Sequence, residues 1–303
     1  MENLKLKESS QPIISRILKS EIFHNYKKNL PAIIGSIIFV ITILIAIFGP
    51  FFTVQNPYDL AEISLSDSYI PPSWVDGGDS KFLLGTDVQG RDILSAIVYG
   101  SRISMFIGIV GMLFSCGIGT FIGLISGYFG GKIDVLVMRI ADIQLSFPTT
   151  LLAIFIMTMF GRGIDKILIA LTMVGWVRYA RTVRGEVLAV KKKEFIEASK
   201  AMGLPDFTII FRHVLPNILT SVVVLSTIQV GRFILTEATL SFLGVGVPIT
   251  KPSLGLLVKN GFDVMFSGLW WASVFPGLYI MIIVFGVNLL GDFLRDELNP
   301  KLK

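Results

Sequence analysis

Two ionisable side chains interrupt an otherwise uncharged stretch of this 303-residue chain, and they are its first candidates for chemistry. Arg232 and Glu237 lie five residues apart in the apolar run after Pro216. This spacing puts them about 140° apart around an α-helix, so they are poorly placed to pair. Charges inside a membrane usually face a bundle interior or an aqueous path. Both are therefore candidates for a translocation path, although Glu237 lies near the end of the run, where reaching water is the alternative.

The side chains that usually form enzyme active sites are scarce. Two histidines and one cysteine are too few for a disulfide scaffold, a zinc cluster or an iron site. Cys116 lies among apolar residues and is expected to act as a small hydrophobic group. Gly130-Gly131-Lys132 is not a nucleotide-binding P-loop, because Ile133 stands where a serine or threonine would hold magnesium. We therefore expect no enzymatic activity, no metal site and no cofactor on this chain.

The composition is typical of a membrane protein. Hydrophobic residues make up 52% of the chain and charged residues 16%, and the mean hydropathy is +0.71, whereas a soluble domain is about a quarter charged. A helix needs roughly 20 apolar residues to cross the hydrocarbon. Uncharged runs predict spans at 30–52, 103–129, 143–160 and 269–290.

Two further spans are less apolar. One covers 167–177 and crosses only if it begins near Gly163 and continues past Arg178 and Arg181, whose side chains would reach the headgroups. The other covers about 217–247. With six spans and a cytoplasmic N-terminus, 19 basic residues lie inside and 7 outside, as the positive-inside rule requires. This bias supports both spans and explains the net charge of +5 without nucleic acid.

The chain divides into residues 1–102 and a core of residues 103–303. The first part holds a cytoplasmic tail, one span and an acidic outer loop, which is expected either to touch an extracytoplasmic partner or to be a solvated connector. The core holds five spans and a basic cytoplasmic loop at about 182–216. Both termini are expected in the cytoplasm.

Small residues recur at four-residue spacing along the second predicted span. They are Gly111, Ser115, Gly119, Gly123 and Gly127. On a helix they form one stripe, which lets a second helix approach closely where packing holds a membrane bundle together. We expect this stripe to serve helix packing and not substrate binding.

The basic cytoplasmic loop has the pattern of two short amphipathic helices. Apolar residues recur at helical spacing through 185–202, and Gly203 follows where a helix C-terminus places glycine. Asp206 can cap a second helix over 207–213, which Pro216 is expected to close. Two such helices outside the bilayer indicate a surface that inserts into another protein.

Two loops of the chain resemble known motifs, one in the cytoplasmic loop and one in the outer loop. The EAA motif of permease subunits of ATP-binding-cassette importers is matched by Glu197, Ala198, Ser199, Gly203, His213, Leu215 and Pro216. The outer-loop signature of one branch, the second permease of dipeptide, oligopeptide and nickel importers, is similar to Gly85, Thr86, Asp87, Gly90, Arg91, Asp92 and Ser95. Stretches at 237–244 and 288–296 also match this branch.

The resemblance implies an all-α type I importer permease fold with six membrane helices in a bacterial inner membrane. It implies half of a pore for peptides, completed by a homologous second permease. Two separate ATP-binding subunits, which would carry ATP and magnesium, and an extracytoplasmic substrate-binding protein are the other implied partners. Nickel chelates or glutathione are alternative solutes, and a self-sufficient secondary transporter or channel is the alternative function.

Three positions depart from the family pattern. Ser199 replaces the second alanine of the EAA motif but is still small, so close helix approach should survive. Ala96 stands where the branch usually has arginine, which puts in doubt any contact of that side chain. Asn299-Pro300 replaces Asp-Pro at an expected turn.

Overall fold

The computed structural model describes residues 21–59, 61–248, 250–251 and 253–298. Outside these residues lie the N-terminal tail up to residue 20, the Asn299-Pro300 turn and the basic residues Lys301 and Lys303.

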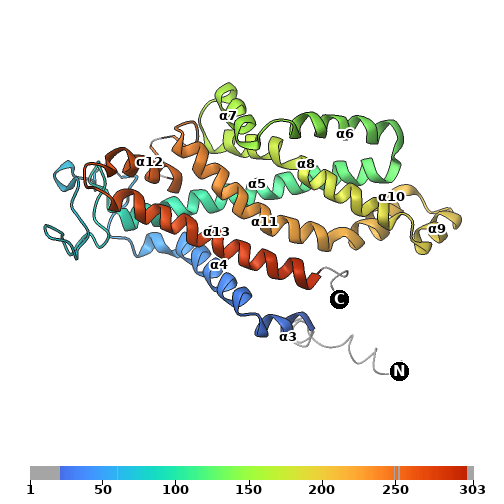
Figure 1. Ribbon diagram of the computed structural model, residues 1–303, viewed down its shortest axis with the longest axis horizontal. Coiled ribbons are helices and arrows are strands. Elements are labelled where there is room, and N and C mark those ends of the chain that lie inside the picture. The colour runs from blue at the N-terminus through green and yellow to red at the C-terminus, as the bar shows by residue number, and fades with distance from the viewer. Residues whose placement is uncertain (1–20, 60, 249, 252, 299–303) are drawn as a thin grey trace.

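The described chain is a bundle of long helices that run roughly along the longest axis of the molecule (Figure 1). Its only β feature is a single bridge between Thr86 and Asp92. One end carries the 53–92 loop and α12 (Leu254–Met265), and we call it the loop end. The opposite end carries α9 (Glu194–Ala201), and we call it the α9 end.

Four described helices have the length and apolar composition needed to cross a membrane. They are α4 (Leu30–Phe48), α5 (Ile93–Phe129), α11 (Leu215–Phe242) and α13 (Trp271–Leu298). Four of the predicted spans fall on these helices. The chain is therefore a multi-pass helical membrane protein.

The predicted span at 143–160 is wrong as a single straight helix. The structure has α6 (Gly131–Leu145) and α7 (Thr149–Phe160), which meet at an angle of 92°. Pro148 lies at the break, with ψ at 128°. Proline has no N–H to donate and disfavours helical geometry in the residue before it, so the helix ends ahead of Pro148. A fifth spanning segment results only if this bent pair counts as one span.

The weakest predicted span belongs to a long helix. α8 (Ile164–Val190) begins directly after Gly163 and continues well beyond Arg178 and Arg181. Both features meet the condition set for this span, and Arg178 lies near the middle of α8. Arg181 forms an ion pair with Asp142 of α6.

The stripe of small residues on α5 lies against α8. A Cβ atom on Gly119 would lie 2.4 Å from the carbonyl oxygen of Trp176, and one on Gly123 would lie 2.6 Å from that of Ala180. Ser115 donates a hydrogen bond of 3.3 Å to the carbonyl of Leu171. These distances leave no room for larger side chains, so the stripe sets how closely α5 and α8 pack.

The first and last described helices meet at the α9 end. Asn25 of α3 (Glu21–Lys28) donates hydrogen bonds of 3.1 and 3.0 Å to the two carboxylate oxygens of Glu297 in α13. Tyr26 packs edge-on against Phe293, with ring centroids 5.5 Å apart. The described chain therefore starts and finishes at the same end of the bundle (Figure 1).

α12 is a helix that the sequence analysis did not predict. Ser253 caps it by accepting a hydrogen bond of 3.4 Å from the backbone N–H of Leu256. A Cβ on Gly255 would lie 2.3 Å from the carbonyl oxygen of Ala238, and one on Gly261 would lie 2.2 Å from the backbone of Ala272. α12 is thus wedged between α11 and α13 at the loop end.

Candidate functional site

The residues of the EAA-like motif lie in two helical segments at the α9 end. α9 ends in a Schellman motif, in which Gly203 N–H donates to the Lys200 carbonyl at 2.9 Å and Leu204 N–H donates to that of Ser199 at 3.2 Å. Gly203 has φ at +75°, in the left-handed region that favours glycine. The glycine therefore lets the chain turn sharply after α9.

The predicted helix over 185–202 is wrong as one element. α8 ends at Val190, and α9 begins at Glu194 after a turn of three lysines. Positive charge stabilises a helix C-terminus, and negative charge stabilises an N-terminus. The lysines follow the end of α8, and Glu194 and Glu197 lie in the first turn of α9, so the charge pattern favours two helices with a break between them.

The second predicted segment, 207–213, is helical, but its predicted end at Pro216 is wrong. The chain is helical without interruption from α10 (Asp206–Thr208) through the π-helix η3 (Ile209–Val214) into α11. Pro216 lies in the first turn of α11. A π turn shifts the backbone hydrogen bonds by one residue, and this local change accommodates a proline inside a continuous helix. The motif therefore leads directly into a candidate membrane span.

The motif residues differ in what they contact. Glu197 and Ala198 are exposed, whereas Ser199 is buried and donates a hydrogen bond of 2.7 Å to the carbonyl of Phe195. The carbonyl of His213 accepts a hydrogen bond of 2.7 Å from the Asn217 side chain. The small side chain of Ser199 thus permits packing within the loop itself, and it does not lie on the outer face.

α9 is held to the helix ends by one polar cluster around Tyr128. Tyr128, near the end of α5, donates a hydrogen bond of 2.6 Å to the carboxylate of Asp206. The ammonium groups of Lys191 and Lys200 lie 5.5 and 5.2 Å from the centre of its ring, which is within the range of cation–π attraction. One tyrosine therefore joins α5, α9, α10 and the turn after α8.

Apolar packing fixes the same segments. Ile196 of α9 and Ile209 of η3 are fully buried in one hydrophobic cluster with Val187 of α8 and Val214. Such a cluster makes the segment move with the ends of α5, α8 and α11, because closely packed interiors transmit displacement.

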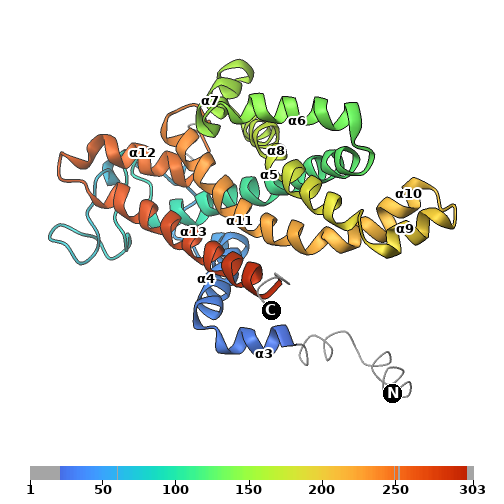
Figure 2. The same ribbon diagram turned by 45° about the vertical axis from the view of Figure 1, so that its right-hand side comes forward.

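The outer surface of the same segment carries large exposed apolar side chains. Met202 is 72% exposed and Phe207 71%, and Phe195 and Phe211 are also exposed. The rings of Phe207 and Phe211 are in contact, with centroids 4.5 Å apart and planes tilted by 40°. We call these four residues the apolar patch; in both views it belongs to segments that project beyond the long helices (Figure 1, Figure 2). Large exposed apolar side chains gathered on one segment are typical of an interaction surface.

The outer-loop signature is buried and forms the joint between the loop and α5. Thr86, Asp87, Arg91 and Asp92 are each at most 5% exposed. The Thr86 hydroxyl donates to the Asp67 carbonyl at 2.5 Å, and the Arg91 Nε donates to the Asp87 carboxylate at 2.7 Å. These buried side chains are therefore not available for contacts with another protein.

Asp92 determines where α5 begins. Its carboxylate accepts hydrogen bonds from the N–H and the hydroxyl of Ser95, at 2.8 and 2.5 Å, as an N-cap. Burial raises the pKa of Asp92, and the hydrogen bonds from Ser95 oppose this rise. The helix consequently starts ten residues before the run at 103–129 that was predicted from charge alone.

The two signature glycines have positive φ, at +82° for Gly85 and +76° for Gly90. A side chain at Gly90 would lie 2.0 Å from the carbonyl oxygen of Ser64. The departure at Ala96 falls in the adjacent hydrophobic core, where the alanine is buried.

Glu237 and Arg232 have opposite surroundings. Glu237 is 0% exposed, and its two carboxylate oxygens accept hydrogen bonds from Ser104 of α5 at 2.6 Å and from Ser241 at 2.7 Å. The interpretation that Glu237 reaches water is therefore wrong. Arg232 is exposed on the surface of α11, and its charge acts on that of Arg178 of α8. Sequence reasoning did not connect these two arginines, because they belong to separate helices that are distant in the sequence.

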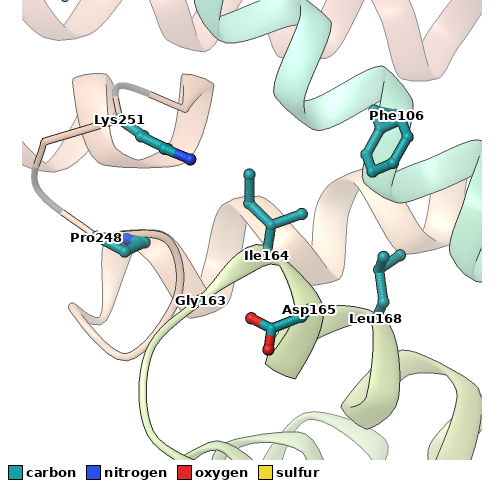
Figure 3. Close-up of a pocket in the computed structure, with 7 residues that line it drawn as sticks. All are labelled: Phe106, Gly163, Ile164, Asp165, Leu168, Pro248 and Lys251. Carbon is teal, nitrogen blue, oxygen red and sulfur yellow. The ribbon is translucent and has the colours of Figure 1, made fainter.

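An open hollow of about 440 Å³ lies at the loop end, beside the start of α8. Its lining residues are Phe106, Gly163, Ile164, Asp165, Leu168, Pro248 and Lys251. Figure 3 shows the Lys251 ammonium and the Asp165 carboxylate on opposite sides of Ile164. Asp165 pairs with Lys166 at 2.8 Å. This hollow holds no cluster of groups suited to catalysis.

Comparisons with known proteins agree with this arrangement. The family model of the binding-protein-dependent transport system inner membrane component matches residues 119–303, and that of the N-terminal TM domain of oligopeptide transport permease C matches residues 18–72.

Curated relatives match along most of the chain. The dipeptide transport system permease protein of Haemophilus influenzae is 38% identical over 93% of this chain and 95% of its own length. The oligopeptide transport system permease protein of Bacillus subtilis is 40% identical over 92% of this chain and 88% of its own. A glutathione transport system permease protein of Pectobacterium atrosepticum is 41% identical over 75% of each chain. The chain belongs to the family of binding-protein-dependent inner membrane permeases of ATP-binding-cassette transporters, within its dipeptide and oligopeptide branch.

Proposed function

We propose that this chain forms half of the translocation pore of a peptide importer and couples to a separate ATPase through the apolar patch and the EAA-like residues. The apolar patch is the observation that carries this proposal. It is exposed on the outside of a segment that Tyr128 and the buried isoleucines hold to α5, α8 and α11. A partner that binds the apolar patch and moves would therefore displace α5, α8 and α11 together.

In the proposed topology the chain crosses the membrane six times, with both termini in the cytoplasm. The bent pair of α6 and α7 would be the third span, and α8 the fourth. The meeting of α3 with the end of α13 supports an even number of crossings. The α9 end would then be cytoplasmic, in line with the basic residues that gather there.

A homologous second permease, two ATP-binding subunits that carry ATP and magnesium, and an extracytoplasmic binding protein would complete the complex. Peptides are the proposed solutes because the dipeptide and oligopeptide permeases match over nearly the whole chain. The glutathione permease match keeps glutathione as a second candidate solute. In this complex Arg232 would line the path, and the buried Glu237 would hold α5 and α11 together beside it.

Reconstitution into liposomes tests the proposal. The chain is purified with its second permease and ATPases, and uptake of labelled alanyl-alanine is measured with binding protein outside and ATP inside. Uptake should require every subunit. Uptake by this chain alone, driven by an ion or proton gradient, would show a secondary transporter and contradict the proposal.

A further inference from the structure

Arg178 and Arg232 form a pair of cations on two neighbouring long helices. Arg178 lies close to the middle of α8 (Ile164–Val190), and Arg232 lies about one turn beyond the middle of α11 (Leu215–Phe242). Both side chains are exposed. Neither position is in the first or last turns of its helix.

Contacts on both sides of the pair hold the two helices together. A Cβ on Gly175, one turn before Arg178, would lie 2.5 Å from the ring of Phe233. Tyr179 donates a hydrogen bond of 3.2 Å to Ser226 of α11. Arg178 and Arg232 lie on the helix stretches between these two contacts, and their like charges repel each other.

The pair lacks the acidic partners that neighbouring arginines have. Arg181 and Arg184 of the same helix form ion pairs with Asp142 and Asp134 of α6. Within the described part of the chain, no carboxylate and no hydrogen-bond acceptor contacts either guanidinium group of the pair. Two adjacent cations without a counter-charge are costly in a membrane unless they face water or bind an anion.

A carboxylate is the anion that such a site fits best. Guanidinium groups bind carboxylates through two parallel hydrogen bonds, and the charge makes these bonds stronger than neutral ones. A peptide carries a carboxylate at its C-terminus. An acidic residue of the second permease would supply the same chemistry from a different source.

We propose that Arg178 and Arg232 form a carboxylate-binding subsite of the translocation path, which neutralises the C-terminal carboxylate of a passing peptide. This inference rests on the proposed importer function and goes beyond it, because it adds Arg178 to the path and names the group that is recognised. The subsite favours solutes with a free carboxylate over their amides.

Thiol labelling of the complete importer tests the charge at the site. Arg232→Cys is made in a Cys116→Ser background, and the mass of this chain reports reaction with a sulfonate-bearing and a trimethylammonium-bearing methanethiosulfonate. For each reagent, the rate of reaction with the thiol introduced by Arg232→Cys is divided by its rate with 2-mercaptoethanol. We expect this normalised rate to be higher for the sulfonate than for the trimethylammonium reagent. Arg178→Gln should lower the ratio of the two normalised rates about ten-fold. Thr239→Cys, exposed two turns away on the same helix, should not respond to Arg178→Gln. If neither reagent reacts, the inference is overturned. A preference for the cationic reagent also overturns it, because a carboxylate of a partner subunit would cause that preference.

Transport distinguishes a peptide carboxylate from a carboxylate of the second permease. Uptake of alanyl-alanine and of its C-terminal amide is measured at concentrations of each that saturate the binding protein. Arg178→Gln and Arg232→Gln should each reduce dipeptide uptake about ten-fold and leave amide uptake unchanged. If the wild-type complex transports neither compound, the proposed function fails; if it transports them and the variants affect both equally, only the carboxylate subsite fails.

Discussion

The hydroxyl of Tyr128 donates a 2.6 Å hydrogen bond to the carboxylate of Asp206 and thereby joins the end of α5 to the start of α10. A hydrogen bond to a charged group contributes about 1.5–3 kcal/mol. Because this bond crosses from a long helix to the segment that carries the apolar patch, it belongs to the connection between the two.

Tyr128→Phe should weaken coupling without preventing assembly. The buried ring remains, but the bond to Asp206 is lost, so the apolar patch can move without moving α5. We expect the amount of peptide imported per ATP hydrolysed to fall several-fold in proteoliposomes. Tyr69→Phe, at the loop end, is the control. An unchanged ratio in Tyr128→Phe would show that the hydrogen bond plays no part in coupling.

Phe207→Ala should reduce the affinity for the ATPase subunits. Phe207 is 71% exposed, so its loss costs the folded chain little, whereas a central aromatic side chain at an interface contributes about 2 kcal/mol or more. The expected loss is about thirty-fold in binding of the purified permease pair to the ATPases. Phe285→Ala, also exposed but on α13, should bind like the wild type. Equal affinity of both variants would exclude the apolar patch as the contact.

Gly123→Leu should disrupt the packing of α5 on α8. Its new side chain would meet the Ala180 carbonyl, 2.6 Å from the Cβ position, and overpacking of this kind costs about 1–3 kcal/mol. Gly117→Leu is a matched control in the same helix, since nothing lies within 4 Å of its Cβ position. We expect a lower apparent Tm in detergent for Gly123→Leu only. The same Tm for both variants would argue against close packing of these helices.

Ionisation of Asp92 should make the joint between the 53–92 loop and α5 less stable as the pH rises. Because burial raises its pKa in the folded chain, the folded state holds the proton more tightly than the unfolded state does. Stability is therefore lost between the ordinary pKa of aspartate, about 3.9, and the raised value. Asp92→Asn keeps an N-cap but cannot ionise. Relative to the wild type, its apparent Tm should increase from pH 4 to pH 7, and a constant difference would contradict this prediction.

The apolar helices and the small-residue stripe were predictable because local pattern determines them. The charge-free runs located α4, α5 and α13, and Gly203 located the end of α9. The breaks were harder. Pro148 was taken as tolerable inside a span and in fact bends it by 92°, whereas Pro216 was taken as a stop and lies inside a continuous helix. Whether a proline bends a helix or is accommodated within it depends on whether the neighbouring turns can rearrange their backbone hydrogen bonds.

The surroundings of the charged residues depend on contacts between distant segments. Glu237 was expected near water, but Ser104, more than a hundred residues earlier in the chain, encloses it. The helix was expected to continue past Arg178, as it does, but the placement of Arg178 and Arg232 on neighbouring helices was not predicted. α12 was missed because its start is marked only by the Ser253 cap and its position by close glycine contacts with α11 and α13. No local pattern contains such information.

Site-specific crosslinking tests the central claim most directly. A photoreactive amino acid is placed at Ala198, which is exposed on α9, and separately at Lys251, which lines the hollow at the loop end. Irradiation of membranes that hold the whole importer should link position 198 to an ATPase subunit and should not link position 251 to it. A crosslink from position 198 to the binding protein, or none to an ATPase subunit, would contradict the proposed coupling surface.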